Sequence, residues 1–207
     1  GLGGKLMVTM MNSGHATMSK WGFSHIDVKD DTHMLDIGCG GGANVAHMLR
    51  ENETGKVYGI DYSLVSVEKT RRVNKNAITD GRCDVQKANV MDLPFKNGMF
   101  DTVTAFETIY FWPDLTEAFS QVHRVLKEDG TFMICNESDG SNAEDERWTK
   151  MINGMTIYKP LDLKKHLEKA GFSNYGAGVT FAAPGYKITS INATEKGKTK
   201  SGTSVAT

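Results

Sequence analysis

Residues His33–Asn44 have the sequence HMLDIGCGGGAN, and this stretch decides the fold of the chain. A short apolar run stops at glycines and resumes at helical spacing, which predicts a buried strand (33–37), a tight turn and a helix (43–51) packed on the strand. Glycines lack a Cβ, so a ligand can approach the backbone closely, and the free N–H groups of the helix favour an anionic group. The stretch predicts a nucleotide-type site.

Asp61 ends the next apolar strand, 56–60. It follows the turn at roughly the 20-residue separation expected of an acid that accepts hydrogen bonds from ribose hydroxyls. Turn and carboxylate together predict an adenosine-bearing ligand. Gly38, Gly40 and Ala43 also satisfy the dinucleotide fingerprint, so an NAD(P)-dependent oxidoreductase is an alternative at this point.

Strand and helix patterns alternate along the rest of the chain. Strands are predicted at 83–88, 100–106 and 131–136, and helices at 64–77 and 114–127, the first of these capped by Ser63. A helix over 161–171 precedes two strands, about 175–181 and 186–193, whose short connection makes them antiparallel. The prediction is an α/β fold: a doubly wound, mostly parallel seven-stranded sheet with a C-terminal antiparallel hairpin, binding ligands at the carboxyl ends of its strands.

Composition narrows the class of protein. The 207 residues carry 24 Lys and Arg against 25 Asp and Glu, so no overall positive field recruits nucleic acid. No stretch approaches the roughly 18 apolar residues of a membrane span. The three cysteines are spread along the chain without metal-ligand spacing, which favours a reducing compartment over a disulfide framework. We therefore expect a cytoplasmic protein of one domain, without metal or membrane partner.

Five motifs, in order and spacing, resemble those of the class I S-adenosylmethionine-dependent methyltransferases. They are DIGCGGG at 36–42, Asp61, DLPF at 92–95, FDTV at 100–103 and RVLKEDG at 124–130. The resemblance runs from about Met34 to Glu137. It implies the Rossmann-like methyltransferase fold, S-adenosyl-L-methionine as cofactor and S-adenosyl-L-homocysteine as product. It also implies direct in-line displacement, in which the protein aligns donor and acceptor and excludes water.

The resemblance also implies where the cofactor binds. The glycine turn would cradle its methionine part, with Asp36 orienting the turn or the ammonium group, or capping turn amides. Asn89 stands where the family has an acid that accepts from the adenine amino group, and its amide oxygen can still accept a neutral hydrogen bond. The expected cofactor-binding residues are Asp36, Gly38, Cys39, Gly40, Gly42, Asp61, Tyr62, Asn89, Val90 and Phe106.

No catalytic residue is obligatory, because the methyl donor is already activated. An oxygen or nitrogen acceptor can also need a general base. The candidates are His15, Glu107 and Tyr110, although His15 also suits a packing role and Glu107 a capping role. Family members often carry His where this chain has Tyr110.

The segment 138–160 contains aromatic residues and methionines, which suggest that the methyl acceptor is apolar or aromatic. Arg147 in the same segment could pair with an acidic group of the acceptor. A plain amphipathic covering helix explains the same pattern at 138–160. The expected substrate-binding residues are Trp21, Trp112, Arg147, Trp148, Met151 and Tyr158.

The domain organisation expected is a helical lead-in at 1–30, a methyltransferase domain at 31–193 with a substrate-covering insertion at 138–160, and a flexible tail at 194–207. The lead-in is either a lid over the site or a cover for the core. The favoured function is methyl transfer to a small molecule by a monomer or homodimer. RNA methylation and a non-catalytic S-adenosylmethionine-binding module are alternatives. The oxidoreductase is least favoured, since no Tyr-x-x-x-Lys pair stands where a short-chain reductase has one.

Overall fold

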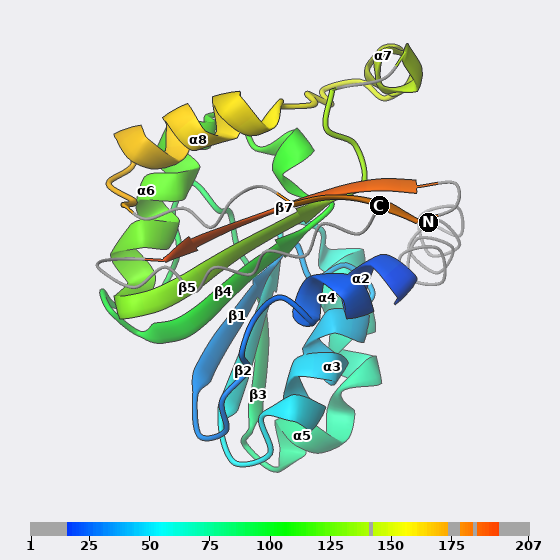
Figure 1. Cartoon of the computed structure of the whole chain (residues 1–207). Helices are drawn as coiled ribbons and strands as arrows, with labels where there is room; N and C mark the ends of the chain where they lie inside the picture. Colours follow the sequence, from blue (N-terminus) through cyan, green and yellow to red (C-terminus); the bar gives the residue numbers. More distant parts are fainter. Residues whose placement is uncertain (1–15, 141–142, 174–178, 184–185, 195–207) are drawn as a thin grey trace.

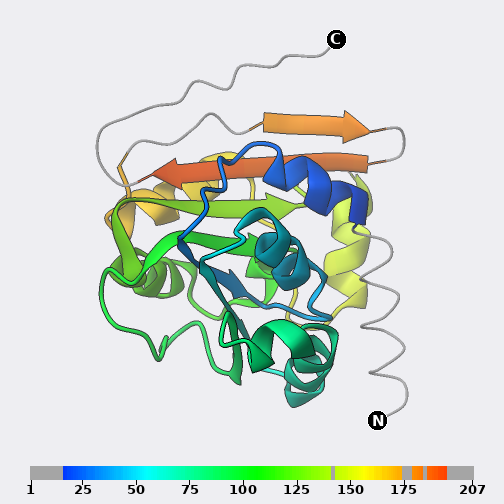
Figure 2. The same ribbon diagram turned by 90° about the horizontal axis from the view of Figure 1, so that it is seen from below.

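The computed structural model describes residues 16–140, 143–173, 179–183 and 186–194, with side chains for 18–140 and 145–173. At its centre lies a sheet with the strand order β3-β2-β1-β4-β5-β7-β6. The first five of these strands pair in parallel, which confirms the parallel core of the predicted fold. β7 pairs antiparallel with β5 and β6 at one edge (Figure 2). The strands are β1 (His33–Ile37), β2 (Lys56–Asp61), β3 (Cys83–Lys87), β4 (Phe100–Phe106), β5 (Leu126–Asn136), β6 (Val179–Ala183) and β7 (Tyr186–Thr194).

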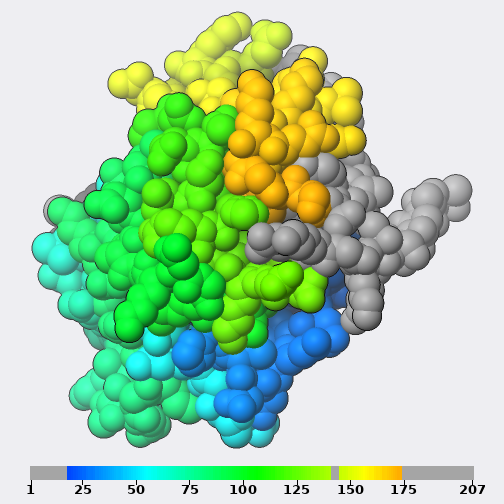
Figure 3. All heavy atoms as spheres, turned by 90° about the vertical axis from the view of Figure 1, so that its left-hand side faces the viewer, coloured from blue at the N-terminus to red at the C-terminus, as the bar shows by residue number. Residues whose placement is uncertain are grey.

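Helices cover both faces of the sheet (Figure 1). One face carries α2 (Ala16–Phe23), α3 (Ala43–Glu51), α4 (Leu64–Val73) and α5 (Lys75–Thr79). The other carries α6 (Leu115–Val125) and α8 (Pro160–Lys169), seen from outside in Figure 3 with α8 in orange. A separate apolar core fills each face, around Met48 and Val67 on one side and Phe119 and Leu163 on the other. The short helix η1 (Ile109–Phe111) follows β4, and α7 (Ala143–Met151) follows β5.

Among the elements that are described over their whole predicted range, two boundaries differ from the sequence prediction by more than two residues. The single helix expected at 64–77 is broken at Asn74 (φ −105°, ψ 24°), and the buried amide of Asn74 donates to the carbonyl oxygens of Thr70 and Gly42. β5 begins at Leu126 rather than at 131, because Leu126 pairs with Phe100 before the register shifts. Helical periodicity continues through both points, so the pattern alone does not show either break.

Membrane-spanning helices and cysteines can be assessed in the described part of the chain. No helix in that part is long and apolar enough to cross a bilayer. Cys39, Cys83 and Cys135 are all free thiols and all buried. The expected lead-in and tail lie partly outside the described residues, and their roles stay predictions.

Candidate functional site

The glycine turn after β1 adopts a backbone that only glycine takes up easily. Gly38, Gly40 and Gly42 have φ values of 77°, 52° and 83°, in the left-handed region. The amides of Gly38 and Cys39 both donate to the carbonyl oxygen of Ile60, at 2.8 and 2.9 Å. The turn is therefore fixed against the end of β2.

The segment after β4 touches this turn. A Cβ on Gly38 would lie 2.3 Å from Oγ1 of Thr108, so glycine is needed here for close approach as well as for its φ value. β1 and β4 are neighbours, and the strand order reverses between them. In open α/β sheets ligands bind in the crevice at this reversal, outside the carboxyl ends of the strands.

Asp61 closes the turn from the end of β2. Its side chain is 7% exposed; Oδ2 accepts from the Gly40 amide at 3.0 Å and Oδ1 from the Ser63 amide at 2.8 Å. Burial raises the pKa of Asp61 above its ordinary value, although these hydrogen bonds oppose the rise. Each carboxylate oxygen can accept a second hydrogen bond, so capacity remains for hydroxyl donors. Ser63 occupies the N-cap position of α4, but its side chain makes no capping hydrogen bond, contrary to the prediction.

Asp36 is a carboxylate inside the sheet. It is 1% exposed, and Oδ1 accepts from Oγ1 of Thr104 at 2.8 Å. Oδ2 has no partner among the described residues, and burial raises the pKa of Asp36 to about 7. A buried acceptor without a partner is costly, so this position suits an external donor such as an amino group.

Glu107 and Tyr110 lie together after β4. Glu107 has a φ of 56°, and its amide donates to the carbonyl oxygen of Cys135 at 2.9 Å. Its Oε1 accepts from the Tyr110 hydroxyl at 3.2 Å and from the Glu137 amide. Burial, with a smaller repulsion from Glu137, raises the pKa of Glu107 to about 8. Burial also raises the pKa of Tyr110, which favours its neutral hydroxyl as a donor.

The residues expected around adenine differ in exposure. Tyr62 is 78% exposed, Val90 is buried, and Asn89 is exposed with its Oδ1 accepting from the Met91 amide at 3.0 Å. Phe106 is buried, 5.0 Å from the ring of Phe23 on α2. Their contact with a cofactor stays a prediction.

The expected substrate-binding residues fall into two groups. Trp21 and Tyr158 are half-buried, and Trp112 is buried in the core with its Nε1 donating to Oγ1 of Thr108 at 3.3 Å. The α7 residues are exposed: Arg147, Trp148 and Met151. His15 lies outside the described residues. These assignments also stay predictions.

Two polar residues that the sequence motifs did not indicate also hold the turn, Thr70 on α4 and Asn74 at the end of that helix. Oγ1 of Thr70 donates to the carbonyl oxygen of Gly40 at 3.0 Å, and the Asn74 amide donates to that of Gly42 at 3.2 Å. The signal was present: they are four residues apart, and thus on one face of a helix.

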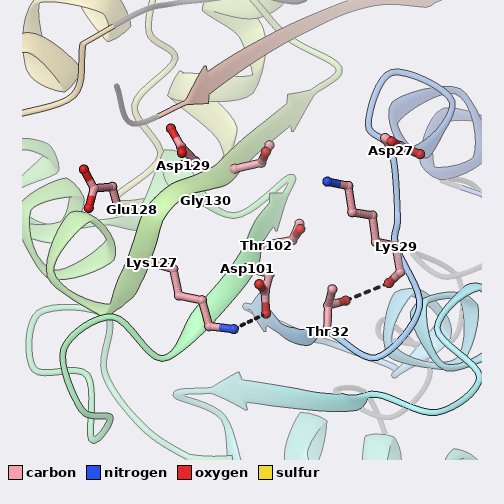
Figure 4. A pocket seen from close by; sticks show the side chains of 10 residues that line it. Asp27, Lys29, Thr32, Asp101, Thr102, Lys127, Glu128, Asp129 and Gly130 are labelled. Atoms are coloured by element: carbon pink, nitrogen blue, oxygen red, sulfur yellow. Dashed lines mark hydrogen bonds and ion pairs between the residues drawn. The ribbon is translucent and has the colours of Figure 1, made fainter. Parts of the chain in front are cut away.

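A polar hollow of about 230 Å³ lies at the other end of the sheet (Figure 4). Its base is the ion pair of Lys127 with Asp101, whose Nζ and Oδ2 are 2.8 Å apart. Thr32 precedes β1, and Asp101 stands near the start of β4. The hollow is therefore at the amino ends of the strands, away from the glycine turn.

Comparison with known proteins gives a family match. A family model described as "Methyltransferase domain" matches residues 35–134, which covers the motif region. The 27-O-demethylrifamycin SV methyltransferase of Amycolatopsis mediterranei is 32% identical over 144 residues, which are 67% of this chain and 53% of that protein. The chain spans about half the length of this relative and a smaller share of some other relatives.

Solved structures share the fold. A SAM-dependent methyltransferase from Aquifex aeolicus has a TM-score of 0.75 at 17% identity, covering 92% of this chain and 97% of that one. Geranyl diphosphate C-methyltransferase from Streptomyces coelicolor, in complex with Mg²⁺, geranyl diphosphate and S-adenosyl-L-homocysteine, has a TM-score of 0.73 at 15% identity. That likeness covers 88% of this chain and 79% of the other.

Proposed function

Because the chain belongs to the class I S-adenosylmethionine-dependent methyltransferases, we propose that it transfers a methyl group from S-adenosylmethionine to a small-molecule acceptor. One observation carries the proposal: a left-handed glycine turn, closed by the Asp61 carboxylate, stands where the strand order reverses. When bound, the cofactor supplies a methyl group already activated for displacement. The chain has to bind the cofactor and the acceptor, orient them toward each other and exclude water.

The residues of the turn fit this cofactor. The unpaired Oδ2 of Asp36 can receive the ammonium group of the methionine part, and Asp61 can accept from the ribose hydroxyls. Tyr62, Asn89 and Val90 would then bound the adenine. The turn and Phe106 complete the proposed cofactor-binding set: Gly38, Cys39, Gly40, Gly42 and Phe106.

We propose Glu107 as the proton acceptor when the substrate nucleophile is a hydroxyl or amine. Its pKa of about 8 lies near neutral pH, where a general base is effective. Its left-handed backbone is a strained conformation of a kind that clusters at functional sites. As the acceptor is methylated, its O–H or N–H proton would move to Oε2 of Glu107.

The acceptor is proposed to be apolar or aromatic and covered by the insertion 138–160. Exposed Trp148 and Met151 on α7 and half-buried Tyr158 supply apolar surface there, and Arg147 supplies a charge for an acidic group. The name of the rifamycin relative states a small-molecule substrate, which supports a small molecule rather than RNA as the methyl acceptor.

The lead-in 1–30 is proposed as a lid. Oγ of Ser19 on α2 donates to Oδ1 of Asn44 at 2.6 Å, and Asn44 lies at the start of α3, just after the glycine turn. A Cβ on Gly22 would lie 2.9 Å from the ring of Phe106 and 3.0 Å from the sulfur of Cys135. α2 thus touches the start of α3 and the ends of β4 and β5. The complete domain is proposed as the seven-stranded form ending in the β6–β7 hairpin, in a cytoplasmic monomer or homodimer.

Calorimetric titration with S-adenosylmethionine, S-adenosylhomocysteine and NADH tests the cofactor. We expect binding of the first two only. Asp61→Ala should weaken it about 10²- to 10⁴-fold, because two hydrogen bonds to a charged group contribute about 1.5–3 kcal/mol each. Asp84→Ala, at an exposed position on the neighbouring strand β3, is the matched control and should bind normally. Unchanged affinity of Asp61→Ala, or binding of NADH alone, would contradict the assignment.

A further inference from the structure

Tyr110 contacts both ends of the insertion that follows β5. Its hydroxyl accepts from the Ser138 amide at 2.9 Å, where the insertion begins. Its carbonyl oxygen accepts from the Thr156 amide at 2.9 Å, after α7 has ended. The 17 residues between them, 139–155, include α7 with its exposed Trp148 and Met151. One buried residue therefore fixes where this segment leaves the domain and where it returns.

The same hydroxyl also reaches the proposed base. Its oxygen is 3.2 Å from Oε1 of Glu107 and 3.3 Å from the carbonyl oxygen of Ser138. A hydroxyl has one proton, so it can serve only one of these acceptors fully. A charged carboxylate is the stronger acceptor, so the hydroxyl donates its hydrogen bond to Glu107 when Glu107 is ionised. When Glu107 is neutral, the hydroxyl donates to the carbonyl oxygen of Ser138 instead.

We propose that Tyr110 is a positioning residue that couples the insertion 138–156 to the carboxylate of Glu107, through one hydroxyl hydrogen-bonded to both. The proposal rests on the proposed function of Glu107 as proton acceptor. The charge state of Glu107 then changes how the covering insertion is held, and the position of the insertion changes how well Glu107 is oriented. Such coupling acts equally in both directions.

The surroundings of Glu107 support this role. Oε1 receives the Tyr110 hydroxyl and the Glu137 amide, whereas no described residue hydrogen-bonds to Oε2. Oε2 is thus left for the acceptor's proton. The titratable groups that interact with Glu107 are Tyr110 from η1, and Cys135 and Glu137 from β5 and its end. None of them is a cation, so the hydroxyl is the only side-chain donor in the described structure that stabilises the carboxylate.

Tyr110→Phe tests the coupling, because it removes the hydroxyl and keeps the buried ring. The first readout is the titration of the Glu107 carboxyl, followed by NMR in protein labelled with ¹³C at glutamate carboxyls and assigned with Glu107→Gln. We expect its midpoint to rise by about one pH unit, since a hydrogen bond to the charged form is lost. The second is amide hydrogen exchange over 138–156, which should be at least about tenfold faster. Neither readout needs an acceptor.

Tyr158→Phe is the matched control, since this tyrosine lies just after the segment 138–156, within the insertion 138–160, and no hydrogen bond of its hydroxyl is found in the described structure. It should change neither readout. Glu107→Gln, which preserves side-chain shape, gives the reciprocal test above pH 8, where wild-type Glu107 is ionised: removing the charge should alter exchange near Ser138. An unmoved Glu107 titration in Tyr110→Phe, or unchanged exchange in both variants, would overturn the proposal.

The same variants separate this proposal from the proposed function. If the protein failed to bind S-adenosylmethionine while Tyr110→Phe still moved both readouts, the coupling would stand and the function would fall. If methyl transfer is found, Tyr110→Phe should lower kcat about tenfold or more with cofactor affinity within about twofold of wild type. The pH profile of kcat for Tyr110→Phe should shift to higher pH by the same amount as the NMR midpoint of Glu107.

Discussion

Gly38→Ala is the substitution whose effect the structure defines most closely. An alanine at φ 77° costs about 1–2 kcal/mol for the backbone alone. Its Cβ would also lie 2.3 Å from Oγ1 and 2.8 Å from Cβ of Thr108, and overpacking of this kind costs about 1–3 kcal/mol more. We expect the free energy of unfolding to fall by about 2–5 kcal/mol in urea denaturation.

Two other glycines serve as controls for the backbone cost. Gly40 has a φ of 52° and the nearest atom to its Cβ would be 3.8 Å away, and Gly81 has a φ of 76° with no atom within 4 Å. Alanine at either should cost only about 1–2 kcal/mol. In a Thr108→Gly background, Gly38→Ala should lower the free energy of unfolding by no more than Gly40→Ala or Gly81→Ala does. Equal losses at all three glycines in the wild-type background would refute the close contact between turn and post-β4 segment.

Two further predictions concern buried ionisable groups. The pKa of Asp36 is about 7 in the folded protein against 3.8 ordinarily, so between pH 4 and 7 the folded state keeps a proton that the unfolded state has released. Stability should therefore fall as pH rises through this range, and Asp36→Asn should flatten the slope of the urea midpoint against pH; an unchanged slope would show that Asp36 titrates normally. Burial raises the pKa of Cys83 to about 11 and also raises those of Cys39 and Cys135, so a thiol reagent at pH 8 should react slowly with native protein and with three equivalents after denaturation. Rapid native reaction would mean that at least one thiol is accessible.

The parallel core could be predicted because its signals are local. Most of its strands contain short apolar runs bounded by glycine or polar residues, whereas β3 alternates polar and apolar residues. The amphipathic helices between the strands show their own period. Asp61 was recognisable because an acid at the end of an apolar strand needs partners, and the turn beside it supplies one.

Other features depend on contacts between residues far apart in sequence. Nothing near Tyr110 indicates that its hydroxyl meets Ser138, 28 positions later. The left-handed backbone of Glu107 follows no local rule, since glutamate rarely adopts it. The contact of Gly38 with Thr108 likewise joins two loops that only the sheet brings together. The binding turn was thus predictable, whereas the arrangement around the proposed base was not.

The hydrogen bonds that fix the glycine turn also bear on the speed of binding. With the amides of Gly38, Cys39 and Gly40 already paired to the end of β2, the turn does not have to become ordered when a ligand arrives. Binding therefore loses little backbone entropy at this point, and the association rate is set by diffusion into the crevice rather than by folding of the loop. Slow steps in the catalytic cycle would then arise in the segments that cover the crevice.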